Sequence, residues 1–189
     1  MKRYLLTLAI GCFGCLLCAA QSLPKITEKD TQSFTAKRAE LYKWQPWQFL
    51  IGTWKGDAKG DAGEGPGEFT FKTDLDGKIL EATNNQEFPA KDGHPAFTFH
   101  SLMIIYLSGT DTQAIFYDNE GHVLNYTVQF SDNPKKVTFT GETVAYTPAY
   151  RFSYTDNGDG TLKVDFDTAP ANAPKAFTSH VAGVVKRAK

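Results

Sequence analysis

A regular series of short β-rich runs, separated by turn residues, constrains this chain more than any other feature. The runs lie near residues 51–59, 67–74, 78–88, 97–106, 112–118, 123–131, 136–142, 150–155, 161–167 and 177–187. Asp76-Gly77, Asn119-Glu120-Gly121 and residues 157–160 between them supply residues that tolerate the positive φ of tight hairpin turns. No connection is long enough for a crossover helix, so consecutive strands should be antiparallel neighbours.

Many of these runs alternate apolar and polar side chains, as in residues 68–72 (EFTFK), 136–140 (KVTFT) and 161–167 (TLKVDFD). Such alternation is typical of a sheet with one buried face, and a sheet of this kind can close upon itself. The sequence therefore predicts an all-β fold, an antiparallel up-and-down β-barrel of about ten strands, within a domain spanning residues 44–189. Eight strands already suffice to hold one small ligand, so we expect a cavity inside the wider barrel.

The first twenty residues have the layout of a secretory signal peptide. Lys2 and Arg3 precede an apolar run, and the small residues Cys18 and Ala20 predict cleavage before Gln21, which would make the protein secreted or periplasmic. The run is shorter than the roughly 20 residues of a membrane-spanning helix, so no membrane span is expected. The alternative is a lipid anchor at Cys12, because residues 9–12 (AIGC) loosely match the sequence before a lipidated cysteine.

Residues 21–43 form a polar leader ahead of the barrel. Helix formers are frequent from residue 28 to 43, and Phe34, Leu41 and Tyr42 share one helical face. We expect either a short helix lying on the barrel, with the stems of Lys37 and Arg38 covering apolar surface, or a partly ordered leader. The next residues, 44–50 (WQPWQFL), are dense in aromatics around a proline and predict a tight turn or 3₁₀ segment that plugs one end of the fold.

The first predicted strand carries a Gly-x-Trp pattern in residues 49–56 (FLIGTWKG), which resembles the calycin superfamily that includes the lipocalins. In that superfamily the first-strand tryptophan closes the barrel floor and a basic residue of the last strand packs over it. The resemblance implies these structural roles for Trp54 and Arg187. Residues 47–187 also resemble an uncharacterised bacterial lipocalin-like family, through short motifs such as LDGKILE at 75–81 and FTGE at 139–142. That family implies a fold and no activity.

The chain is also similar to the nitrobindin family, haem-binding barrels that isomerise peroxynitrite to nitrate. The similarity lies in residues 52–56 (GTWKG) and in the closing run 180–187 (HVAGVVKR), and it implies that His180 is an axial haem ligand. Strand parity places Val181, Gly183, Val185 and Arg187 on the more apolar face and His180 on the solvent face. A bulge at Gly183 would instead bring both His180 and Arg187 inside.

The same parity predicts which side chains line the barrel interior. We expect the cavity to be lined by Phe69, Phe71, Phe97, Phe99, Met103, Val164 and Val181, above a floor formed by Trp54 and Arg187. An interior of this composition has few polar anchors. It should select ligands by shape and apolar area and not by charge.

Signals for other functions are scarce. The 20 basic and 21 acidic residues nearly cancel, and the basic residues do not cluster with aromatics, so no nucleic-acid partner is expected. Serine-hydrolase, zinc-protease and phosphate-loop motifs are absent from the sequence. His94, His100 and His122 lack metal-ligand spacing, so a metal site is expected only if the fold assembles them in space.

Three functional hypotheses remain. The first, which the sequence favours, is a secreted barrel that binds a small apolar or amphipathic ligand, needs no cofactor and is not an enzyme. The second is a haem protein with nitrobindin-like chemistry at His180. The third is a structural or envelope-associated module with a filled core and no ligand.

Overall fold

The computed structural model describes residues 25–61, 63–91, 93, 95–133 and 135–189. The predicted signal peptide and Cys12 lie outside the described residues. The order of elements is α1 (Glu28–Leu41), η1 (Gln45–Trp47), β1 (Gly52–Gly60), β2 (Gly63–Asp74), β3 (Ile79–Phe88), β4 (Phe97–Ser108), β5 (Asp111–Asp118), β6 (Val123–Asp132), β7 (Lys135–Gly141), β8 (Ala149–Asp156), β9 (Thr161–Ala169) and β10 (Thr178–Arg187).

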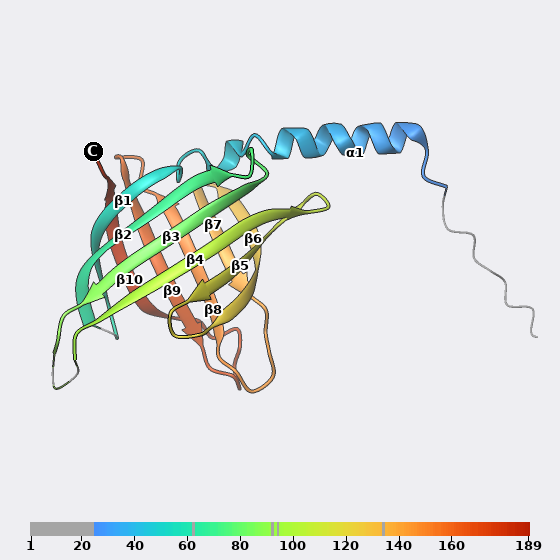
Figure 1. Cartoon of the computed structure of the whole chain (residues 1–189). Coiled ribbons are helices and arrows are strands. Elements are labelled where there is room, and N and C mark those ends of the chain that lie inside the picture. The colour runs from blue at the N-terminus through green and yellow to red at the C-terminus, as the bar shows by residue number, and fades with distance from the viewer. Residues whose placement is uncertain (1–24, 62, 92, 94, 134) are drawn as a thin grey trace, which may run out of the picture.

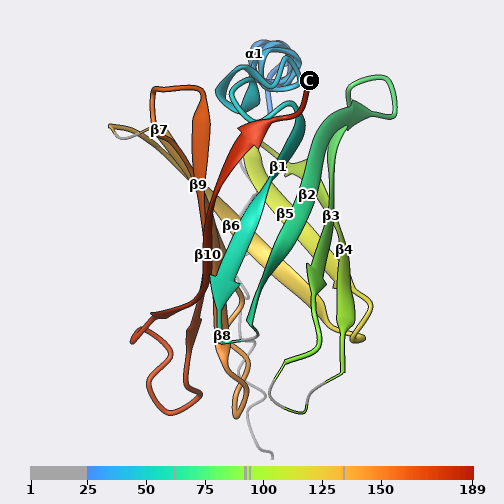
Figure 2. The ribbon, with the colours of Figure 1, turned by 90° about the vertical axis from the view of Figure 1, so that its left-hand side faces the viewer.

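The ten strands form a closed barrel in which each strand pairs with its neighbours in the chain, and β1 closes the ring against β10 (Figures 1 and 2). Every pairing is antiparallel. The prediction of a ten-stranded antiparallel up-and-down barrel is therefore confirmed. The strand boundaries agree with the predicted runs except at β2, which begins several residues earlier than expected.

The early start of β2 has a steric cause. The β1–β2 hairpin is rich in glycine, and the backbones of Gly60, Gly65 and Gly67 lie unusually close to neighbouring strands. A methyl group on Gly60 would clash with the carbonyl oxygen of His180, and one on Gly65 would clash with that of Glu87. Because glycine has no side chain at these positions, the strands can approach closely enough to pair.

One end of the barrel is plugged by the aromatic segment at η1. The ring of Trp47, which is 2% exposed, lies 5.0 Å from Phe130 and 5.8 Å from Phe139 between ring centroids. Trp44 enters η1 with a positive φ of 53°, and its indole nitrogen donates to the carbonyl of Gly77 at 2.8 Å. The aromatic turn predicted for residues 44–50 therefore closes this end, which we call the closed end.

Only Leu41, the last residue of the N-terminal helix α1, packs against the barrel core, so the helix does not lie along the barrel as one of the two expectations had it. The helix points away from the barrel in Figure 1, and none of its residues is buried. Arg38 packs over the rings of Phe34 and Tyr42 instead of covering barrel surface, because the apolar positions of α1 form no continuous stripe. Among the described residues, no helix has the length and apolar character needed to span a membrane.

Candidate functional site

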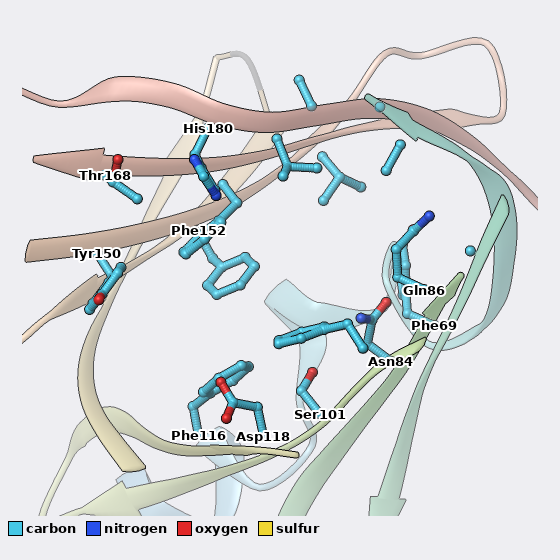
Figure 3. A pocket seen from close by; sticks show the side chains of 18 of the residues that line it. Phe69, Asn84, Gln86, Ser101, Phe116, Asp118, Tyr150, Phe152, Thr168 and His180 are labelled. Atoms are coloured by element: carbon cyan, nitrogen blue, oxygen red, sulfur yellow. The ribbon is translucent and has the colours of Figure 1, made fainter. Parts of the chain in front are cut away.

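The barrel encloses a cavity of about 620 Å³. Exposed lining residues such as Glu120, Pro148 and Pro170 come from the turns opposite the closed end, so the cavity opens to solvent there. We call this end the mouth. Toward η1, by contrast, buried aromatic and aliphatic side chains fill the barrel. The cavity therefore ends before it reaches the closed end. Figure 3 shows the cavity with labelled lining residues from several strands.

Most of the predicted lining residues reach this cavity. Its wall includes Phe69, Phe97, Phe99, Met103, Val164 and Val181. Phe71 does not line it: this side chain is 1% exposed and packs between Trp47 and Tyr154, with ring centroids 6.4 and 5.3 Å away. The alternation of β2 places Phe71 on the inner face. Because Phe71 lies near the closed end, it belongs to the packed core and not to the cavity wall.

Trp54 and Arg187 lie beyond the cavity, toward the closed end. Trp54 is 3% exposed, and its indole nitrogen donates to the carbonyl of Leu50 at 2.8 Å. Arg187 stacks over the Trp54 ring and donates hydrogen bonds to the carbonyls of Ile51 and Phe49. Their position suits a floor, and neither lines the main cavity.

Sequence reasoning missed several aromatic wall residues. Phe116 on β5, Tyr126 on β6, and Tyr150, Phe152 and Tyr154 on β8 all line the cavity. In each strand these residues occupy the inward-facing positions of the alternation. The same alternation pattern could therefore have predicted them from the sequence. The phenyl rings of Phe152 and Phe116 are 5.6 Å apart between centroids, so side chains of β5 and β8 meet inside the barrel although β6 and β7 separate these strands in the sheet (Figure 3).

The wall also holds more polar groups than predicted. Asn84, Ser101, Asp118 and Thr168 are among the cavity-lining side chains labelled in Figure 3. Gln86 lines the cavity too, but its amide nitrogen is bound to the wall, donating to the carbonyl of Gly65 at 2.6 Å. The wall is mainly apolar, as expected, but it carries more polar anchors than the sequence predicted, because several short polar residues occupy inward positions of β3, β4 and β5.

His180 lines the cavity, contrary to the parity argument that turned it toward solvent. A bulge between Ser179 and Val181 places His180 as an extra residue, so that both it and Val181 reach the interior. The bulge therefore lies at His180 itself and not at Gly183. The Nδ1 atom of His180 is 2.9 Å from a carboxylate oxygen of Asp61 in the β1–β2 turn, and Phe166 meets the imidazole edge-on at 5.7 Å.

An acidic turn borders the mouth between β5 and β6. The Asp118 carboxylate accepts hydrogen bonds from the backbone nitrogens of Glu120 (3.0 Å) and His122 (2.9 Å), and it lies 2.8 Å from His122 Nδ1. The ligand atoms of these three residues lie within 4.8 Å of one another. The hydrogen bonds of Asp118 hold the β5–β6 turn together, and this explains why the three side chains lie close to one another. His100 has the outward parity of β4, and His94 lies outside the described residues.

Tyr126 is the one side chain in the described chain with a fully buried polar atom that lacks a hydrogen-bond partner. Burial raises the pKa of Tyr126, and the nearby Tyr150, Tyr154 and Asp118 raise it further. Burial alone raises the pKa of Tyr154. Both hydroxyls therefore stay neutral at physiological pH and act as potential hydrogen-bond donors inside the barrel.

Comparison with known proteins supports the fold. No protein-family model and no curated protein matches the sequence. Among solved structures, Rv2717c from M. tuberculosis is similar, with a TM-score of 0.55 and 14% identity over 77% of this chain and 98% of that one. A de novo designed fluorescence-activating β-barrel matches with a TM-score of 0.35 and 12% identity over 75% and 95% of the two chains. The first likeness bears on the fold alone, and the second is too distant to carry weight.

Proposed function

We propose that this chain is a lipocalin-like barrel that binds a small amphipathic molecule in its cavity. The observation that carries the proposal is a space of about 620 Å³ with aromatic walls and one open end. Pockets of several hundred cubic ångströms with apolar walls and a few polar groups are typical of small-molecule sites. The wall is mainly apolar, and the polar residues Asp118 and Thr168 lie at strand ends near the mouth, so an amphipathic ligand could place its apolar part inward and its polar part against them.

The cavity also speaks against a structural module with a filled core. Protein interiors are normally packed as densely as organic crystals, and a space of this size inside the barrel departs from that packing. A ligand that binds only the folded state would stabilise it by mass action, by about 2.7 kcal/mol at a hundredfold excess over its dissociation constant. Secretion is part of the proposal and rests on the signal-peptide pattern of residues 1–20.

A pair of variants on β4 tests the proposal. Ser101 lines the cavity, whereas the next residue, Leu102, is on the outer face and 36% exposed. We expect a neutral fluorescent dye such as Nile red to bind the wild type saturably, and Ser101→Phe to weaken that binding about tenfold or more by filling the space. Leu102→Phe should leave binding unchanged. Equal affinity in both variants, or no dye binding by the folded wild type, would contradict the proposal.

Haem binding at His180 is the second candidate, and one observation favours it. His180 lines the cavity, and its Nδ1 is held by Asp61 at 2.9 Å. Metal-binding histidines commonly donate their other ring nitrogen to a carboxylate, which fixes the tautomer and leaves Nε2 as the ligand. Phe166 and the apolar wall would shield such a group from water. Bound haem would supply the iron chemistry by which nitrobindins isomerise peroxynitrite.

Titration with haemin separates the two candidates. If His180 is the axial ligand, haemin should give a sharp Soret band that His180→Ala abolishes, while the mouth variant His122→Ala retains it. A haemin spectrum that both variants share would exclude His180 as the ligand. Dye binding that persists in His180→Ala would leave the small-molecule proposal in place.

A further inference from the structure

We infer that the cavity selects its ligand by charge: it accepts an amphipathic molecule whose head group donates hydrogen bonds and carries no negative charge, such as an amine or an alcohol, and discriminates against carboxylates. The inference rests on the proposed function and specifies its ligand class. Three observations carry it: the sign of the charges around the cavity, the buried carboxylate of Asp118, and the unpartnered hydroxyl of Tyr126.

Acidic residues and no cationic ones line the cavity. Among the described lining residues the acidic ones are Asp57, Asp118 and Glu120, the last two at the mouth, and no lysine or arginine is present. Arg151 on β8 lies between the wall residues Tyr150 and Phe152 in sequence, but it already forms an ion pair with Asp167 at 2.7 Å. A ligand carboxylate would therefore lose its hydration without gaining a cationic partner, which is costly in a largely apolar site.

Asp118 would oppose a carboxylate directly. Its side chain is only 4% exposed, and its three partners, two backbone N–H groups and the imidazole of His122, lie at the mouth-facing turn. An ionised carboxylate offers about four lone-pair positions, so Asp118 retains acceptor capacity for a donor from a ligand. An ammonium or hydroxyl group meets this need, whereas a second carboxylate would be repelled.

Tyr126 offers the second polar contact. It is 2% exposed, and the rings of Phe116, Phe139 and Phe152 surround it at 6.2 to 6.4 Å between centroids. Its hydroxyl has no hydrogen-bond partner among the described residues, although Tyr126 lines the cavity. A buried hydroxyl without a partner destabilises the protein, so a polar ligand group that displaces the neighbouring rings and reaches this oxygen would supply the missing hydrogen bond.

Competition among three ligands of equal chain length tests the inference. Nile red, which is neutral, is displaced from the full chain by decylamine, 1-decanol or decanoate, each below its micelle concentration and at pH 8, above the range where histidine usually titrates. This choice matters because His122 and His180 both line the cavity. We expect decylamine and decanol to compete about tenfold or more better than decanoate.

Two variants assign the selectivity to its residues. Asp118→Asn should reduce the preference for decylamine over decanoate several-fold, and the asparagine side-chain oxygen can still accept the hydrogen bonds of the turn. Tyr126→Phe should weaken decanol binding while leaving Nile red binding intact. Asp111→Asn is the matched control, because Asp111 is exposed at the opposite end of the same strand, β5, and should change neither preference.

The outcomes distinguish the inference from the function on which it rests. Decanoate that competes as well as decylamine, or an unchanged preference in Asp118→Asn, would overturn the charge selection while cavity binding stands. A wild type that binds neither Nile red nor any of the three ligands would overturn both.

Discussion

The guanidinium carbon of Arg187 lies 4.4 Å from the ring centroid of Trp54, so the end of the last strand covers the tryptophan of the first. The two residues are direct register partners where β1 and β10 close the barrel. The same guanidinium group donates to the carbonyls of Ile51 and Phe49, which ties the segment after η1 to the barrel rim. A single cation–π contact contributes about 0.5–1 kcal/mol at exposed sites, so the buried tryptophan should contribute most of the stability here.

Trp54→Ala should therefore reduce the free energy of unfolding by about 3–5 kcal/mol, because it removes a buried indole and leaves a void that the closed end cannot fill. Chemical denaturation monitored by circular dichroism measures the loss. Lys55→Ala, at the neighbouring outward position, is the control and should have little effect. A Trp54→Ala protein with wild-type stability that no longer binds Nile red would show that Trp54 contacts ligand and is not a floor residue.

Tyr126→Phe should stabilise the ligand-free protein by about 1–3 kcal/mol, since it removes a buried hydroxyl that has no partner. The aromatic ring and its contacts stay in place. Thermal and denaturant unfolding of the ligand-free chain measure the gain, with Tyr117→Phe as the control because Tyr117 is 42% exposed. A clear loss of stability would mean that the hydroxyl is hydrogen-bonded in solution.

Stability should fall in alkali because of two buried tyrosines. Burial raises the pKa of Tyr126 and of Tyr154 above the ordinary value of 10.0. The unfolded chain would release these protons first, so stability is intact below about pH 10 and decreases as the pH rises above it. Denaturant unfolding between about pH 8 and pH 11, with phenolate absorbance as the second readout, measures this slope. The double variant Tyr126→Phe with Tyr154→Phe should flatten it, and an unchanged slope would contradict the assignment.

Gly60→Ala should disturb the wall at His180. The added methyl group would meet the carbonyl oxygen of His180, and that oxygen also accepts the backbone N–H of Asp61 at 3.0 Å. Overpacking of this kind typically costs about 1–3 kcal/mol. We expect that loss together with a displaced imidazole resonance of His180 in NMR spectra. Lys59→Ala, at the exposed neighbouring position, should change neither the stability nor the resonance of His180. A Gly60→Ala variant with wild-type stability and spectrum would show that the bulge tolerates the methyl group.

Local patterns in the sequence were enough to predict the barrel. Turn residues, among them Gly77, Gly121 and Gly158 with positive φ, separate the β-rich runs of the chain, and alternation within the runs assigns an inner face. Both signals are local, because hairpin turns and side-chain parity depend on residues that are close in sequence. The same reasoning placed Phe69, Phe99 and Met103 on the cavity wall.

The depth of the cavity and the polar groups that reach it depend on contacts between distant parts of the chain. Phe71 points to the same inner face of β2 as Phe69. It is nevertheless part of the packed core, because Trp47 enters the barrel from a segment outside the sheet and packs against it. His180 faces inward because β10 carries an extra residue opposite Phe166, and a bulge shifts parity without leaving a mark in the alternation. The pairing of Asp61 with His180 is likewise set by two segments that lie far apart in the chain. These features depend on how the sheet closes, and period-two patterns within single strands do not encode that closure.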